Sequence, residues 1–160
     1  NHTLDNAHAI EDAGANWLTV HARTKADGYT PPAYWEKIQP ITEALKINVI
    51  ANGEIWNNAD AKACLQQSNC QDIMIGRGAV TTPDLTLCIR ENKNTPVLYW
   101  QDLVELQQRF LSGQFKTEIG MIGRYKQWLG MMTKAYPEAQ ELWTKVKKEK
   151  QLELILQYLK

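Results

Sequence analysis

The chain has 160 residues, of which 44% are hydrophobic and 22% charged, and its 18 basic and 18 acidic side chains give no net charge. These totals are typical of a globular protein with one or two domains, and they argue against a disordered chain. No apolar run approaches the roughly 20 residues of a membrane-spanning helix, and no signal peptide opens the chain, so we expect a cytoplasmic protein without membrane association.

The charged residues are distributed unevenly along the chain, and the cysteines are few. Residues 1–95 carry 8 basic and 11 acidic side chains, whereas residues 96–160 carry 10 basic and 7 acidic ones. The basic C-terminal part suits either contact with a polyanion or a solvated helical surface. Cys64, Cys70 and Cys88 lack metal-ligand spacing and are odd in number, so we expect no disulfide framework and no metal site.

Strand-like and helical patterns alternate over residues 1–95. Short apolar or β-branched runs predict strands over 17–22, 47–51 and 72–76. Helical periodicity predicts helices over 1–13, 34–45, 57–67 and 83–92. Such alternation is typical of βαβ units in a parallel sheet, and a closed barrel needs eight strands. We therefore expect an α/β fold that is the C-terminal part of a (β/α)8 TIM barrel, with about three βα units and an open sheet edge.

From residue 96 onward the sequence shows only helical periodicity. Predicted helices cover 99–111, 118–136, a segment starting at 137, and 150–160. These helices predict an all-α helical bundle domain over residues 96–160, following a partial-barrel domain over residues 1–95.

The predicted helix over 118–136 has an apolar stripe, and opposite it lie Gly120, Gly123 and Gly130. Each glycine inside a helix costs roughly 1 kcal/mol relative to alanine. A helix face without side chains would admit a nucleic-acid backbone at close range. Alternatively, the helix begins after Gly123, and periodicity alone favours this second interpretation.

Two predicted strands end in glycine-containing corners. Asn52, Gly53 and Glu54 follow the second strand, and Gly76 and Arg77 follow the third. Glycine at a strand end permits a sharp turn and lets a ligand approach the backbone. In barrel enzymes the loops after the last two strands commonly hold a phosphate group. Two successive corners, the second with an arginine, favour a phosphate-bearing ligand over tight turns alone.

Two further side chains lie at the expected rim of the barrel. His21 ends the first strand, where it either contacts a ring cofactor or substrate or is satisfied by the local backbone. Tyr29 lies in the polar loop that follows, where an aromatic ring is free to stack on a base or a flavin.

Four segments together resemble a known family. VHARTKADGY, IANGEIW, MIGRGAVTTPDL and IGRYKQWL are closely similar to the C-terminal half of bacterial tRNA-dihydrouridine synthases, and most similar to the C subfamily. The resemblance covers essentially the whole chain. It implies an FMN enzyme that uses NADPH to reduce a uridine of tRNA, in this subfamily the D-loop uridine at position 16.

The resemblance also implies roles for individual residues. The positions matching the family's FMN site are Asn52, Gly53, Glu54, Gly76, Arg77 and His21. The positions matching its tRNA contacts are Tyr29, Arg124, Lys126 and Lys147. The family's catalytic cysteine belongs to an Asn-Cys-Gly-Cys-Pro type motif, which is absent here, as is its flavin-binding lysine. We therefore expect that the partner of this chain is the N-terminal half of the same protein, and that the chain alone cannot reduce uridine.

Two other interpretations stay open. The chain is a self-standing, non-catalytic RNA-binding module, or it belongs to another phosphate-binding barrel enzyme that acts on a small metabolite. Pairing of two copies through the open sheet edge is a further hypothesis.

Overall fold

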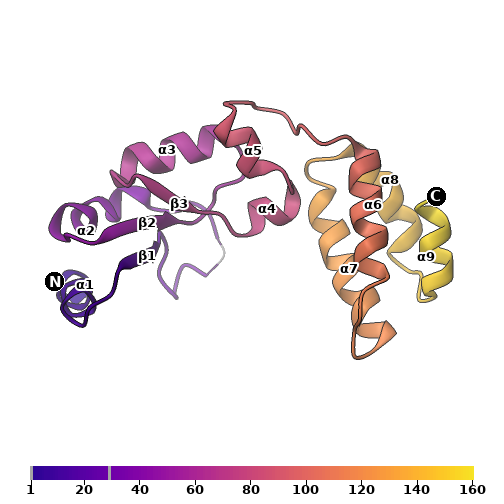
Figure 1. The fold of residues 1–160 in the computed structure, drawn as a ribbon, viewed down its shortest axis with the longest axis horizontal. Coiled ribbons are helices and arrows are strands. Elements are labelled where there is room, and N and C mark those ends of the chain that lie inside the picture. Colours follow the sequence, from indigo (N-terminus) through magenta and orange to yellow (C-terminus); the bar gives the residue numbers. More distant parts are fainter. Residues whose placement is uncertain (1, 29) are drawn as a thin grey trace.

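The computed structural model describes residues 2–28 and 30–160. A part built around a small sheet is followed by an all-helical part, and the segment after helix α5 connects the two (Figure 1). The alternation of strands and helices predicted for residues 1–95 is confirmed, as is the helical character of the remainder.

The sheet contains three parallel strands in the order β1-β2-β3. They are β1 (Trp17–His21), β2 (Asn48–Asn52) and β3 (Asp72–Met74). The register places Val20 beside Ala51, and Ala51 beside Ile73. Among the described residues β1 pairs only with β2, so its other edge is open, as predicted.

Helices cover one face of this sheet. They are α1 (His2–Asp12), α2 (Gln39–Ala44) and α3 (Asn58–Ser68), and α5 (Leu85–Arg90) packs beside α3. The short helix α4 (Arg77–Thr81) instead contacts α5 and the helical part. Val20, Ala51 and Ile73 point towards this layer and join its apolar core. The alternate strand residues point the other way, and among them Trp17 and Met74 are 61% and 47% exposed. The sheet thus buries one face far more completely than the other.

Two details of the predicted helices are wrong. The helix expected over 34–45 is split into a 3-10 turn, η1 (Trp35–Lys37), and the short helix α2. Pro40 lies in the first turn of α2, and proline cannot donate the hydrogen bond that a continuous helix requires there. The short helix α4, which precedes the helix expected over 83–92, was not predicted. Pro83 lies between α4 and α5.

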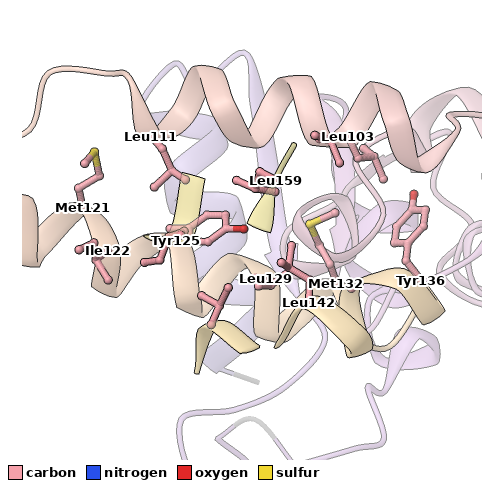
Figure 2. Close-up of a cluster of buried hydrophobic side chains, with 14 residues drawn as sticks. Leu103, Leu111, Met121, Ile122, Tyr125, Leu129, Met132, Tyr136, Leu142 and Leu159 are labelled. Carbon is pink, nitrogen blue, oxygen red and sulfur yellow. The ribbon is translucent and has the colours of Figure 1, made fainter. Parts of the chain in front are cut away.

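The C-terminal helices surround a second apolar core. They are α6 (Trp100–Leu111), α7 (Glu118–Met132), α8 (Pro137–Val146) and α9 (Leu152–Tyr158). Figure 2 shows Leu103 and Leu111 of α6 across from Tyr125 and Leu129 of α7. The Tyr125 hydroxyl donates a 2.9 Å hydrogen bond to the buried side chain of Gln107, so the polar groups of this core are paired with each other.

Gly120, Gly123 and Gly130 all lie within helix α7. The helix begins at Glu118, and its N-cap residue Thr117 accepts a 3.1 Å hydrogen bond from the Gly120 amide. The alternative that the helix begins only after Gly123 is therefore wrong. A Cβ atom at Gly130 would lie 3.6 Å from the Trp143 ring, whereas one at Gly123 would meet nothing within 4 Å.

A buried carboxylate joins the two parts of the chain. Asp84 is 2% exposed and accepts hydrogen bonds from the amides of Val97 (2.5 Å) and Leu98 (2.8 Å). Its other oxygen lies 3.4 Å from the Tyr136 hydroxyl. The connecting segment and the residue that precedes α8 are thereby fixed to the start of α5.

None of the helices in the described part of the chain combines the length and the apolar character that crossing a membrane requires.

Candidate functional site at the strand ends

The C-terminal ends of the strands border one cavity of about 350 Å³. All six positions expected to hold a cofactor line it: His21, Asn52, Gly53, Glu54, Gly76 and Arg77. Parallel strands bring their C-terminal ends to the same edge of a sheet, which is why these distant positions converge. Their gathering is an observation, and their role as FMN ligands stays a prediction.

A carboxylate between two guanidinium groups dominates the charge of this cavity. Glu54 Oε1 accepts a 2.7 Å hydrogen bond from Nη2 of Arg23 and another of 2.7 Å from Nη2 of Arg77. Burial alone would raise the pKa of Glu54, but hydrogen bonds from Trp56 and Arg23 and the charges of both arginines hold that pKa below its ordinary value. With one negative and two positive groups, the cluster retains an excess of positive charge.

Arg23 is the member of this cluster to which the sequence assigned no role. Its side chain is only 1% exposed, and its Nε and Nη1 atoms are buried without a hydrogen-bond partner among the described residues. Burying a guanidinium with unpaired N–H groups costs free energy of folding, so the ion pair with Glu54 must offset much of that cost. In the sequence, only its location just past the end of β1 pointed to a role for Arg23 in the site.

The backbone of the two corners is shaped by glycine. Gly53 has a φ of +130°, a conformation that side chains rarely allow, and Glu54 follows with a φ of +52°. A Cβ atom at Gly78 would lie 2.1 Å from the Ile55 carbonyl oxygen, so the corners after β2 and β3 touch there. A Cβ atom at Gly76 would meet nothing within 4 Å, which leaves space beside that backbone.

His21 is hydrogen-bonded to the side chain of Asn52, and the local backbone, named as one of two alternatives, is not its observed partner. Its Nδ1 lies 2.6 Å from Oδ1 of Asn52, whose Nδ2 donates a 2.8 Å hydrogen bond to the Met74 carbonyl. Because the second bond fixes the amide orientation, Nδ1 of His21 is the donor, and the neutral ring then carries its lone pair on Nε2. Asn52 of β2 thus orients this imidazole directly, and Met74 of β3 orients the Asn52 amide.

Trp56 connects the cavity with the helical part. Its Nε1 donates a 2.9 Å hydrogen bond to Oε2 of Glu54. The guanidinium carbon of Arg77 and Nζ of Lys134 each lie 5.1 Å from a ring centroid of Trp56, within the range of a cation–π contact. Lys134 follows α7, so a residue of the helical part reaches the wall of the cavity.

The residues expected to contact RNA are arranged unequally. Tyr29 lies outside the described residues. Arg124 and Lys147 are exposed, whereas Nζ of Lys126 donates hydrogen bonds to the carbonyl oxygens of Lys147, at 3.2 Å, and Glu149. Two helical positions separated by two residues project about 200° apart, so Arg124 and Lys126 leave α7 on different sides. The structure therefore brings Lys126 to the backbone of Lys147, and the helix rotation directs Arg124 to a different side of α7 from Lys126.

The cysteines do not contribute to the cavity. Cys64, Cys70 and Cys88 are free thiols buried in the protein, and none of them lines it. Burial raises the pKa of Cys64 to about 12, which makes that thiol inert at neutral pH. Within the described residues, no group of three or more histidine, cysteine or acidic side chains is placed to hold a metal ion.

Comparison with known proteins gives a consistent result. Residues 1–157 match the family described as dihydrouridine synthase (Dus). A tRNA-dihydrouridine(16) synthase of Shewanella oneidensis is 46% identical over 160 residues, which cover 98% of this chain and 50% of that protein. The Pseudomonas putida protein of the same name is 40% identical over 156 residues, covering 91% of this chain and 47% of its own length. The chain thus spans about half the length of the curated relatives it matches.

Proposed function

The chain belongs to the dihydrouridine synthase family, and from this premise we propose that it is part of an FMN-dependent enzyme that reduces a uridine of tRNA with NADPH. The relatives are named for position 16, and we infer the same D-loop nucleotide as the target here. We assign the chain to the C subfamily, as the C-terminal half of such an enzyme. The match to about half the length of relatives named for position 16 supports the interpretation as part of a longer protein.

The three strands are, in this proposal, the last three strands of an eight-stranded barrel. Their parallel order and their single helix-covered face agree with this interpretation, because barrel strands carry helices on the outside only. The exposed side chains of Trp17 and Met74 would then point into the barrel interior. Residues 1–95 form the barrel portion, and residues 96–160 form the tRNA-recognition domain.

The cluster of Arg23, Glu54 and Arg77 is the observation that carries the proposed cofactor site. It gives a positively charged wall to a cavity bordered by glycine backbone, and the space beside Gly76 suits a group that approaches the main chain. A phosphate group matches this set of donors because it accepts several charge-assisted hydrogen bonds at once. Asn52, Gly53, Glu54, Gly76 and Arg77 would hold the phosphate and ribityl chain of FMN.

His21 is assigned to the edge of the flavin ring. When bound, FMN supplies the hydride that reduces the uracil ring. The pair of His21 and Asn52 fixes an imidazole with a defined orientation at the cavity, which enables it to position a ring ligand. No cysteine lines the cavity in the described residues, so we place the proton donor upstream in the complete protein.

The helical part is assigned to tRNA. Its residues 96–160 carry 10 basic and 7 acidic side chains, and Arg124 and Lys147 are exposed on it. Tyr29, Arg124, Lys126 and Lys147 are the proposed contributors from this chain. Because such contacts are mainly electrostatic, the affinity for tRNA should fall steeply as salt is added.

Two measurements test this proposal. The complete protein with FMN and NADPH should form dihydrouridine at position 16 of tRNA, whereas this chain alone should form none. Replacing Arg77 by glutamine should weaken FMN binding about tenfold or more, because a charge-assisted hydrogen bond to phosphate is lost. The matched control is Arg90→Gln, which alters an exposed arginine of α5 outside the cavity. Salt-dependent tRNA binding without any FMN binding would instead favour a non-catalytic RNA-binding module.

A further inference from the structure

A lysine-rich turn joins α8 to α9. Residues 145–150 read KVKKEK, and all four lysines of this run, Lys145, Lys147, Lys148 and Lys150, are exposed. None of the ion pairs found in the described part of the chain includes Lys147, Lys148 or Lys150. We call residues 147–150 the lysine turn.

The one acidic residue of this turn is directed to the backbone. Glu149 Oε1 accepts hydrogen bonds from the amides of Lys150 (2.7 Å) and Gln151 (2.9 Å), just before α9 begins. The Gln151 and Lys150 amides hold the pKa of Glu149 below its ordinary value. The carboxylate therefore stabilises the start of α9, and the neighbouring ammonium groups are left to face outward.

A fifth cation fixes the other side of the turn. Lys126 of α7 is half-buried, and its Nζ donates hydrogen bonds to the carbonyl oxygens of Lys147 and Glu149. A cation at the C-terminal end of a helix also interacts favourably with the helix dipole, here that of α8. Lys126 thus binds the carbonyl oxygens of the turn, and Glu149 binds its amides.

We propose that the lysine turn is a contact surface for the phosphate backbone of RNA, in which Lys148 and Lys150 bind phosphates beside Lys147. Lys126 acts as a positioning residue that orders the turn. This inference rests on the proposed function in tRNA modification. It adds Lys148 and Lys150 as contact residues, and it changes the role of Lys126 from a direct RNA contact to the positioning of the turn. Lysine is a point charge that binds phosphate without reading sequence, so the surface orients the RNA and does not select its bases.

The phosphate contacts are tested by the salt dependence of tRNA binding in the complete protein. The double variant Lys148→Gln/Lys150→Gln should bind tRNA about tenfold more weakly at moderate salt. The slope of log K against log salt should decrease by about 1.5, because each phosphate contact contributes about 0.7 to 0.9. The matched control is Lys46→Gln/Lys62→Gln, which alters two exposed lysines before β2 and on α3. It should leave both quantities unchanged.

The role of Lys126 is tested by a double-mutant cycle. Lys126→Met should weaken tRNA binding in the parent protein and speed hydrogen exchange of the Lys150 and Gln151 amides, and Lys126→Arg should restore both. In the background of Lys148→Gln/Lys150→Gln, Lys126→Met should cost much less affinity, because the lysines it orders are gone. An equal loss in both backgrounds, with unchanged exchange, would show a direct phosphate contact and overturn the positioning role.

These outcomes separate the inference from the proposed function. If the parent protein binds tRNA with a steep salt dependence and the lysine-turn variant matches its control, only the inference fails. If the parent protein shows no salt-dependent tRNA binding, the proposed function fails together with it.

Discussion

The ammonium group of Lys134 lies 5.1 Å from the ring centroid of Trp56, so the helical part contacts an aromatic ring that lines the strand-end cavity. The same ring is hydrogen-bonded to Glu54, which holds both arginines of the cavity. Trp56 therefore contacts both the helical part and the charged cluster of the cavity.

This relationship predicts a measurable coupling between Trp56 and Lys134. Lys134→Met should lower the free energy of unfolding by about 0.5–1 kcal/mol, the usual size of a cation–π contact at an exposed site. In a Trp56→Leu background the same change should have almost no effect. The measurement is a double-mutant cycle by urea denaturation. Equal losses in both backgrounds would mean that the contact contributes nothing.

Replacing Gly76 or Gly78 by alanine should have opposite effects on the stability of the protein and on FMN binding. Gly78→Ala should destabilise the protein by about 3 kcal/mol or more, because its Cβ atom would lie 2.1 Å from the Ile55 carbonyl oxygen and the backbone must shift. Gly76→Ala meets open space, so the fold should tolerate it while the methyl group obstructs the proposed phosphate site. Thermal unfolding and FMN titration of both variants test this. A Gly76→Ala protein with unchanged FMN affinity would contradict the placement of the phosphate.

Glu54 should link the stability of the cavity to pH. Its pKa is lowered in the folded protein, since hydrogen bonds and the two arginine charges outweigh the effect of burial. A lowered carboxyl pKa contributes stability that is fully present above the unfolded-state pKa, near 4.3, and is lost as the pH falls through the folded-state pKa. The stability difference between the parent protein and Glu54→Gln should thus be constant from pH 6 upward and shrink in acid. Urea denaturation across this pH range measures it, and a difference that grows in acid would have the wrong sign.

The sequence predicted the parts of the molecule that depend on local pattern. Alternating apolar runs located the three strands, and the glycine corners after β2 and β3 converge on one cavity as expected. Local pattern failed where a single residue overrides periodicity, as Pro40 does in the first turn of α2. It also placed the end of α7 at Tyr136, although the helix ends at Met132 and Tyr136 instead approaches Asp84.

Residues whose roles depend on distant partners were harder to predict. Arg23 is buried because Glu54, in a different βα loop, accepts its hydrogen bond, and nothing near Arg23 in the sequence indicates that partner. Likewise, Lys126 has the sequence context of an exposed basic residue, yet the packing of α8 against α7 brings two carbonyl oxygens to its Nζ. Both cases require tertiary contacts that periodicity does not contain.

Gly123 allows a test of whether the exposed face of α7 has a function beyond folding. A Cβ atom at this position meets nothing within 4 Å, so Gly123→Ala should stabilise the protein by about 1 kcal/mol through helix propensity alone. Gly130→Ala should gain less, because its methyl group must fit beside the Trp143 ring. If RNA approaches the backbone of α7 closely, Gly123→Ala should weaken tRNA binding even as it raises the melting temperature. Increased stability with unchanged tRNA affinity would remove the glycine face from the RNA contact surface and leave the lysine turn and Arg124 as its basic elements.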